Sequence, residues 1–208
     1  KVSYGSFHTK PIDFDEALAK RIANGDFRQL DIFIVGTIMP VPQSLLKMAE
    51  MSDKGDFGYN TSWYGPLERM LHGKGVVNFV PIQYQDGTAT RIEPVWHEDL
   101  RRDIAVFRAG AMDRFGNFNY GVTNGGTRKD VINTPIKIVE VNSNFPTVLG
   151  GMDESINIDE IDYIIESSNQ EMFCIPHMEP EDVEVRIAEN IIPLIKDGAC
   201  LQLGIGGV

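Results

Sequence analysis

The stretch Asp197-Gly-Ala-Cys-Leu-Gln-Leu-Gly-Ile-Gly-Gly-Val208 decides the fold that we predict for this chain. Its pattern predicts a helix that ends at Gly198, a short apolar strand from Cys200 to Leu203, and a glycine loop from Gly204 to Val208. Glycine backbone can approach a ligand that a side chain would hold away, and its N–H groups can bind that ligand. A plain turn from strand to helix also fits the loop, because the six-position dinucleotide fingerprint is missing.

A second junction of strand, glycine and helix lies nearer the start of the chain. Ile32 to Val35 is a short apolar run, Gly36 and Thr37 begin a loop, and a helix is expected from Gln43 to Met51. Open α/β sheets bind ligands at such junctions, so Gly36 and Thr37 form a second candidate ligand edge.

The rest of the chain alternates between strand and helix patterns. Further helices are predicted at Asp13–Gly25, Pro66–Leu71 and Glu181–Lys196, with further strands at Val76–Ile82, Ile104–Phe107, Ile136–Val141 and Tyr163–Ile165. Residues 53–64 and 111–121 are expected to be loop, and residues 85–87 a turn. Several strands are apolar throughout, so we predict an α/β fold with an open, mostly parallel sheet and helices on both faces. We expect one domain over residues 1–175, with residues 176–208 leading into a second.

Composition excludes several classes of function. The chain has 208 residues, 42% of them hydrophobic, and a net charge of −11 from 30 acidic and 19 basic residues. This acidity argues against a binder of nucleic acid or of anionic membranes. No apolar run approaches the roughly 18 residues of a membrane span, and the first residues do not form a signal peptide. Two cysteines make no disulfide framework, so we expect a cytoplasmic protein.

The side chains most often used in catalysis form no self-contained set. The histidines lack the spacing of metal ligands, so structural roles are favoured and no metal is expected; they are His8, His72, His97 and His177. Cys200 is expected to be a buried, inert thiol. Trp63 and Trp96 are expected to be packing residues. Glu140, at the end of a strand, could be catalytic, but we favour a carboxylate bound to backbone N–H groups.

Several motifs in a fixed order resemble one family. They are Asp103-Ile-Ala-Val-Phe107, Asp113-x-x-Gly116-x-x-x-x-Gly121, Lys137-Ile-Val-Glu-Val-Asn142, Phe145-Pro146, Leu149-Gly150, Ile158 to Glu166, and Asp197 to Val208. Together they resemble the acetyl-CoA hydrolase/transferase family of type I CoA-transferases, and within it the 4-hydroxybutyrate and butyrate:acetate CoA-transferases. The resemblance runs from the helix at Asp13 to Val208, and it is strongest from Asp103 onward.

The resemblance implies acyl-CoA chemistry. It predicts a CoA-transferase fold of which this chain is the N-terminal half, with CoA or acyl-CoA as substrate and no permanently bound cofactor. A glutamate would attack the thioester and carry CoA as a glutamyl thioester to an incoming short-chain carboxylate. The loop Gly204, Ile205, Gly206, Gly207 and Val208 would line the CoA and stabilise an oxyanion. Gln202 would position the acyl group, although a structural amide fits equally well, and Gly36 and Thr37 would face the same cleft.

The family's nucleophilic glutamate lies beyond Val208, so no catalytic residue is assigned in this chain. The expected partners are therefore the C-terminal half or a companion chain, acyl-CoA and a carboxylate, in a homodimer or larger assembly. An acyl-CoA hydrolase of the same family and a non-catalytic CoA-binding or interaction module are the alternatives. The basic candidates for the CoA phosphates are Arg101, Arg102, Arg128 and Lys129, for which solvated surface charge is the favoured interpretation.

Overall fold

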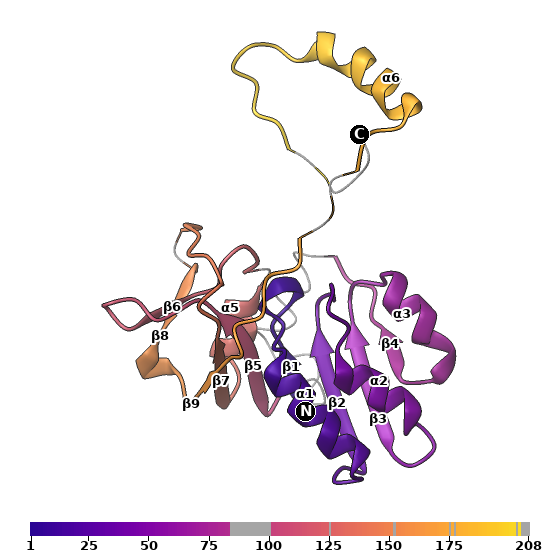
Figure 1. Ribbon diagram of the computed structural model, residues 1–208, viewed down its shortest axis with the longest axis vertical. Coiled ribbons are helices and arrows are strands. Elements are labelled where there is room, and N and C mark those ends of the chain that lie inside the picture. Colours follow the sequence, from indigo (N-terminus) through magenta and orange to yellow (C-terminus); the bar gives the residue numbers. More distant parts are fainter. Residues whose placement is uncertain are drawn as a thin grey trace. The chain divides into compact units, whose positions relative to one another are not determined.

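A computed structural model gives the fold of the chain (Figure 1). It describes residues 1–83, 101–124, 126–151, 153–174, 176, 178–202 and 204. The chain divides into two compact units, Lys1–Phe173 and Cys174–Val208, and each is described here by itself. The predicted turn at residues 85–87, Trp96, His97 and His177 lie outside the described residues.

A seven-stranded parallel sheet forms the centre of the first unit in the described part of the chain. Its order is β4-β3-β2-β1-β5-β7-β9, and each neighbouring pair is parallel. The strands are β1 (Val2–Tyr4), β2 (Gln29–Ile34), β3 (Asp56–Thr61), β4 (Val77–Phe79), β5 (Ile104–Ala109), β7 (Ile136–Val141) and β9 (Tyr163–Glu166). This sheet confirms the predicted mostly parallel α/β class.

The two faces of the sheet have separate cores because side chains alternate along each strand. On β5, Val106 joins one core, while Ala105 and Phe107 join the other. The first core is closed by α1 (Asp13–Ala23), α2 (Gln43–Glu50) and α3 (Pro66–Leu71). The second is closed by α5 (Thr127–Ile132) and by the antiparallel pair β6 (Asn117–Asn119) and β8 (Ser155–Asn157). Helices therefore pack on both faces, as predicted.

Short 3-10 turns complete the described elements. They are η1 (Phe7–Thr9), η2 (His72–Lys74), η4 (Ile158–Glu160) and η5 (Ile192–Leu194).

Most of the predicted elements are present with small changes at their ends. α3 and β7 have the predicted bounds, and β4 is an edge strand that ends before Pro81, as the proline indicated. α1 ends at Ala23, and the left-handed Gly25 follows it at φ 78°. The capping position of this helix is Ile12, whose side chain makes no capping bond.

Two central strands were missed. β1 is only three residues long, and β3 lies in the polar, glycine-containing segment that we predicted to be loop. β3 pairs with β2 over six positions and with β4 over three, and its Phe57 and Tyr59 are buried in the first core. The alternation of Phe57 and Tyr59 was the available signal, and Gly58 between them obscured it. The segment at 111–121 also contains β6, and α5 was not predicted.

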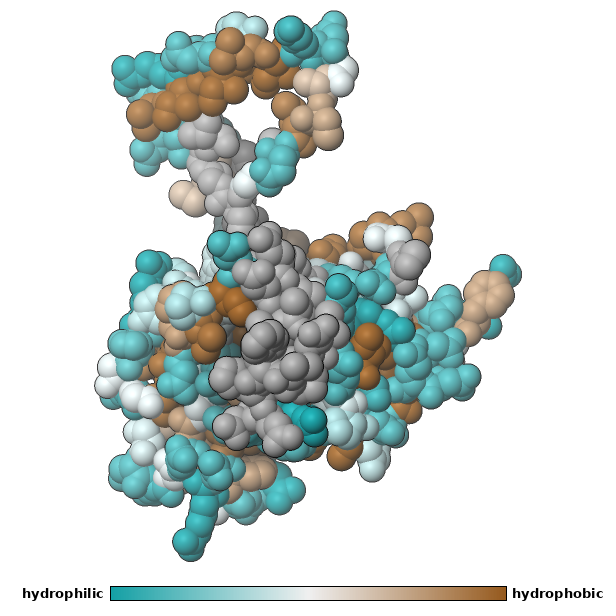
Figure 2. Space-filling model, turned by 180° about the vertical axis from the view of Figure 1, so that it is seen from behind, coloured by the Kyte–Doolittle hydropathy of each residue, from teal (hydrophilic) through white to brown (hydrophobic). Residues whose placement is uncertain are grey.

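The second unit contains one α-helix in its described residues, α6 (Asp182–Ile191). The predicted helix to Lys196 is too long, because Pro193 lacks an N–H and the chain continues as η5. Figure 2 shows an apolar band along this helix, where the exposed apolar residues include Val183, Ile187 and Ile191. These residues carry the periodicity that predicted the helix.

The expected strand at Cys200–Leu203 is not formed over its described residues. Residues 200–202 have no regular structure and are exposed. An extended segment becomes a strand only when a neighbour pairs with it, and no strand pairs with residues 200–202 in the described part of the chain. Cys200 is accordingly an exposed free thiol rather than the buried one expected.

Candidate functional site

The carboxyl ends of the central strands form the ligand edge that this topology defines. In the sheet, β2, β3 and β4 lie in this order on one side of β1, and β5, β7 and β9 lie in this order on its other side. Ligands of open α/β sheets bind outside the carboxyl ends of the strands, at the point where the direction of building reverses. That point lies between β1 and β5. The loops after Tyr4 and Ala109 start there, and the loop after Ile34 starts on the neighbouring strand β2; these three loops are the candidate site.

The loop after β2 carries Gly36 and Thr37, the pair that the sequence singled out. The Gly36 carbonyl accepts a hydrogen bond from the Phe7 N–H at 2.9 Å. A Cβ on Gly36 would lie 2.7 Å from the Phe7 ring and 2.9 Å from the Trp63 Cβ, so only glycine fits. Thr37 Oγ1 and the Tyr59 hydroxyl share a hydrogen bond of 2.6 Å, and burial raises the pKa of Tyr59. Gly36 and Thr37 therefore lie at the ligand edge in a packed setting.

Lys10 binds the part of this loop that follows Thr37. Its Nζ donates to the Ile38 carbonyl at 2.7 Å and to the Pro40 carbonyl, and the residue is 2% exposed. Burial lowers the pKa of Lys10 to about 8, while the negative charge of Asp15 opposes that shift. The side chain therefore fixes the loop through two backbone acceptors rather than through an ion pair at its tip.

Asp15 holds the start of the next helix. Its Oδ2 accepts the Gln43 N–H at 2.6 Å and the Ser44 N–H at 3.3 Å, and its Oδ1 accepts the Ser44 and Tyr4 hydroxyls. Burial raises the pKa of Asp15, and its hydrogen bonds with Ser44 oppose the rise. A carboxylate from α1 thus caps the N-terminus of α2, whose own capping residue, Pro42, makes no side-chain bond. Lys10 and Asp15 together position the segment that begins with Gly36.

Arg108 and Glu140 occupy the other side of the edge. They are register partners on β5 and β7. The Nε and Nη2 of Arg108 donate to the His8 carbonyl at 3.1 and 2.8 Å, and its guanidinium lies 5.2 Å from the centre of the Phe145 ring. Burial lowers the pKa of Arg108, and the nearby carboxylate of Glu140 opposes this. The pair supports the turn that follows β1.

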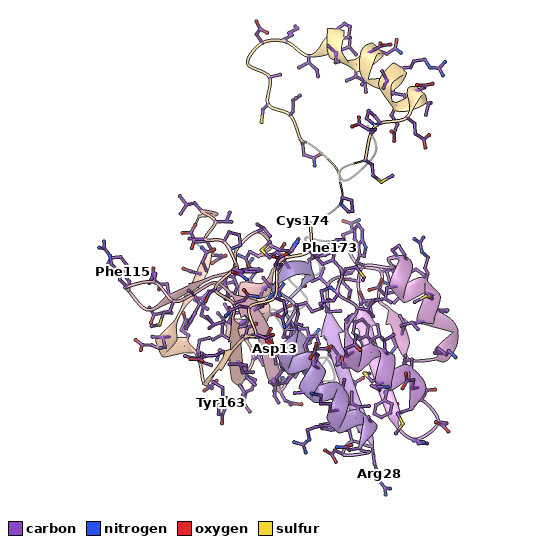
Figure 3. All side chains as sticks on the ribbon, in the orientation of Figure 1. Asp13, Arg28, Phe115, Tyr163, Phe173 and Cys174 are labelled. Atoms are coloured by element: carbon purple, nitrogen blue, oxygen red, sulfur yellow. The ribbon has the colours of Figure 1, made fainter. Side chains whose placement is uncertain are left out.

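The contacts of Glu140 confirm the role that the sequence analysis favoured, that of a carboxylate bound to backbone N–H groups. Its two oxygens accept the N–H groups of Ile12 and Phe14, each at 2.9 Å, at the first turn of α1. Asp13 belongs to the same turn (labelled in Figure 3) and accepts bonds from Ser168 and from the Gln170 side chain. The start of α1 is therefore held between β7 and the segment after β9.

The remaining candidate residues have structural partners or belong to the second unit. Arg128 pairs with Glu160 at 3.0 Å, and Arg102 stacks over the Phe33 ring at 4.2 Å. Arg101 is exposed and Lys129 half-buried. Gln202 and Gly204 are exposed residues of the second unit, and residues 205–208 lie outside the described ones. Gly36 and Thr37 thus lie at the carboxyl end of β2. Gly204 is the one residue of the second glycine loop that the structure describes.

The histidines in the described part of the chain are structural. His8 bonds Thr123 and the Phe173 carbonyl, and the His72 ring packs edge-on against Tyr64 at 5.7 Å. The described residues contain no group of histidine, cysteine and acidic side chains that could hold a metal. Nor do they contain a helix long and apolar enough to cross a membrane.

Sequence reasoning missed Lys10, Asp15 and Arg108 because their partners lie far away along the chain. Lys10 bonds residues 28 and 30 positions away, and Arg108 bonds one 100 positions away. No local pattern marks such contacts. The only hint was the presence of charged residues beside segments that were expected to be buried.

The fold is that of an open, parallel α/β domain with a glycine-containing candidate ligand edge beside its topological switch point. A family model for the acetyl-CoA hydrolase/transferase N-terminal domain matches residues 6–176. The chain belongs to this family, in agreement with the resemblance seen in the sequence.

Named relatives and solved structures agree with this assignment. The butyryl-CoA:acetate CoA-transferase of Anaerostipes caccae is 32% identical over 208 residues, which are 100% of this chain and 44% of the relative. The 4-hydroxybutyrate coenzyme A transferase of Clostridium kluyveri is 33% identical over 73% of this chain and 34% of its own length. RipA from Yersinia pestis superposes over 99% of this chain and 47% of its own, with a TM-score of 0.84 and 27% identity. The chain thus spans less than half the length of the relatives it matches.

Proposed function

We propose that the full-length protein transfers coenzyme A between short-chain carboxylates of the acetate, butyrate or hydroxybutyrate type. The observation that carries this proposal is the family domain over residues 6–176, whose relatives are named CoA-transferases. The position of Gly36 and Thr37 supports it, because they follow β2 at the carboxyl edge of the sheet, where open α/β sheets bind their ligands. CoA is then a substrate rather than a resident cofactor.

The proposed reaction passes through a glutamyl-CoA thioester. A glutamate carboxylate attacks the thioester carbonyl, the carbon–sulfur bond breaks, and CoA leaves as a thiolate from a mixed anhydride. The thiolate attacks the glutamyl carbonyl and releases the original acyl group as a free carboxylate. An incoming carboxylate then repeats these two steps in the opposite order. Because this chain spans 44% of the first relative, we place the nucleophilic glutamate in the other half of the protein.

This chain would supply two backbone surfaces to that reaction. Gly204 to Val208 would line the CoA and donate N–H groups to the oxyanion, a contact whose loss costs about 2.7–4 kcal/mol in other enzymes. Gln202, Gly36 and Thr37 would position the acyl group. We place the domain boundary at residues 175–176 and expect a cytoplasmic homodimer or larger assembly, with no nucleic acid or membrane partner.

A replacement in the terminal glycine loop tests the proposal. Gly206→Val in the full-length protein should abolish CoA binding while leaving the thermal midpoint nearly unchanged, because the side chain would occupy the thioester's place. Gly73→Val is the matched control, since a Cβ at Gly73 meets nothing within 4 Å. An unchanged Michaelis constant for acyl-CoA in Gly206→Val would count against the assignment.

An exchange assay separates transfer from the two alternatives. With labelled acetate and butyryl-CoA, a transferase forms labelled acetyl-CoA, and omitting acetate stops the reaction. An acyl-CoA hydrolase, the activity that the family's name also includes, would release free CoA without acetate. A non-catalytic CoA-binding or interaction module would bind CoA in calorimetry and give neither product.

A further inference from the structure

Glu68 is a buried carboxylate that makes no hydrogen bond to any residue the structure describes. It lies on α3 and is 1% exposed, and neither of its oxygens has a hydrogen-bond partner in the described part of the chain. Buried acids normally accept bonds from nearby donors, because a bare carboxylate in the interior is costly. Glu68 is therefore an acceptor that the described residues around it leave unused.

Glu68 lies next to the ligand edge. A Cβ on Gly36 would meet Trp63, and a Cβ on Gly65 would lie 2.9 Å from Glu68 Oε2 and 3.2 Å from Trp63 Nε1. Gly36, Trp63, Gly65 and the carboxylate thus form a continuous set of neighbours where β2 and β3 end. The absence of a side chain on Gly65 is what leaves room for the Glu68 carboxylate.

The nearest charged and polar groups are already engaged. Glu68 is close enough to Lys10 and Tyr59 for its charge to raise the pKa of each. Lys10 nevertheless donates to the carbonyls of Ile38 and Pro40, and Tyr59 shares its bond with Thr37. Among the residues that the structure describes, none of these neighbours donates a hydrogen bond to the carboxylate.

An apolar hollow opens at the same edge. It has a volume of about 380 Å³ and is lined by Ser62, Phe79, Pro81, Ile82 and Gln83, at the carboxyl ends of β3 and β4. Apolar walls with a few placed polar groups are typical of small-molecule sites. The hollow is open to one side, and its mostly apolar lining suits a short acyl chain in polarity.

We propose that Glu68 is a specificity-determining residue whose carboxylate accepts a hydrogen bond from a hydroxyl group on the acyl chain of the substrate. A hydroxylated chain satisfies the buried acceptor, whereas an alkyl chain of the same length leaves it without a donor. A site with a committed polar group discriminates against analogues that cannot pair with it. This inference rests on the proposed function and adds the residue that selects the acyl chain.

The test compares two acceptors in the full-length enzyme. The ratio of kcat/KM for 4-hydroxybutyrate to that for butyrate is measured with acetyl-CoA as donor. Glu68→Leu should lower this ratio about tenfold, because the apolar side chain removes the acceptor. Glu68→Gln keeps a neutral acceptor of the same shape and should lower it about threefold, which also covers a leucine variant that fails to fold. Glu50→Leu, at an exposed glutamate paired with Lys47, should leave the ratio unchanged.

The outcomes separate this inference from the proposed function. A ratio within twofold of wild type in Glu68→Leu and Glu68→Gln, with transfer intact, overturns the role of Glu68 alone. It would mean that another part of the protein, rather than the substrate, donates a hydrogen bond to Glu68. Absence of transfer by the wild-type enzyme overturns both proposals.

Discussion

Two buried glutamates at the carboxyl edge of the sheet have opposite surroundings. Glu140 on β7 is 0% exposed and accepts two backbone N–H groups at the start of α1. Glu68 on α3 is 1% exposed and has no hydrogen-bond partner in the described part of the chain. Equal burial therefore says nothing about role. The donors that the fold brings to each carboxylate separate a structural acid from one that is available to a ligand.

The contrast has a simple origin in the chain's geometry. The first N–H groups of a helix have no partner within it, so the start of α1 supplies two free donors. The parallel pairing of β5 and β7 places Glu140 opposite Arg108, next to those donors. Glu68 instead lies within the first turn of its own short helix, beside Gly65, which has no side chain to donate.

The largest effect is expected at Glu140. Glu140→Leu should lower the free energy of unfolding by about 3–5 kcal/mol, because it leaves the buried Ile12 amide, the half-buried Phe14 amide and the Arg108 guanidinium uncompensated. Urea denaturation of the intact protein measures this loss. Glu140→Gln, which keeps one acceptor oxygen, should lose clearly less. A loss below about 1 kcal/mol in Glu140→Leu would remove the structural side of the comparison.

The pH dependence of stability tests the buried charge on Lys10. Its pKa is about 8 in the folded protein against 10.5 in the unfolded chain, so the unfolded chain binds the extra proton between these values. Stability of the wild type relative to Lys10→Met should therefore rise between pH 8 and 10.5, by about 3 kcal/mol in total. Below pH 8 the full free-energy cost of burying the charged Lys10 side chain is present. Denaturation at several pH values measures the difference curve.

The same difference curve also tests the interaction between Lys10 and Glu68. Ionisable groups that are present in both the wild type and Lys10→Met cancel in it. The charges that act on Lys10 are Asp15, Arg108 and Glu68. Because the charge of Glu68 raises the pKa of Lys10, the rise should begin at a lower pH when it is measured in a Glu68→Leu background. An unchanged onset would show that the two groups do not interact.

A replacement at Gly36 probes the loop between the two glutamates. Gly36→Val should destabilise the protein by about 2 kcal/mol, because its side chain would overlap the Phe7 ring and Trp63. Gly73→Val, in open surroundings, is the control, and thermal denaturation compares the two. Equal midpoints would mean that the loop is more loosely packed than its contacts indicate.

The smallest effect is expected at Glu68. Glu68→Leu should change the free energy of unfolding by less than about 1 kcal/mol, because no hydrogen bond within the described part of the chain is lost and removing a buried charge offsets the lost attraction to Lys10. Denaturation under the conditions used for Glu140→Leu gives a direct comparison. A loss of 3 kcal/mol or more would show that the carboxylate has a protein partner.

Individual elements show which features of the fold could be predicted from the sequence. The β-branched run of β7, the four-residue repeat of α6 and the Pro66 start of α3 are local signals, and each predicted its element. The strand-end position of Glu140 predicted its bonds to backbone N–H groups, and the structure confirms them. β1 and β3 were missed because their stability comes from neighbours on both sides rather than from their own composition.

By itself the sequence determined the α/β class, most element positions, the Gly36–Thr37 junction and the family, because periodicity and motif order are properties of neighbouring residues. The three-dimensional contacts were needed to show which donors reach Glu140, which carbonyls Lys10 binds, and that no described residue donates a hydrogen bond to Glu68. These outcomes depend on contacts between residues distant in the chain, and such contacts are set by the order in which the strands pair.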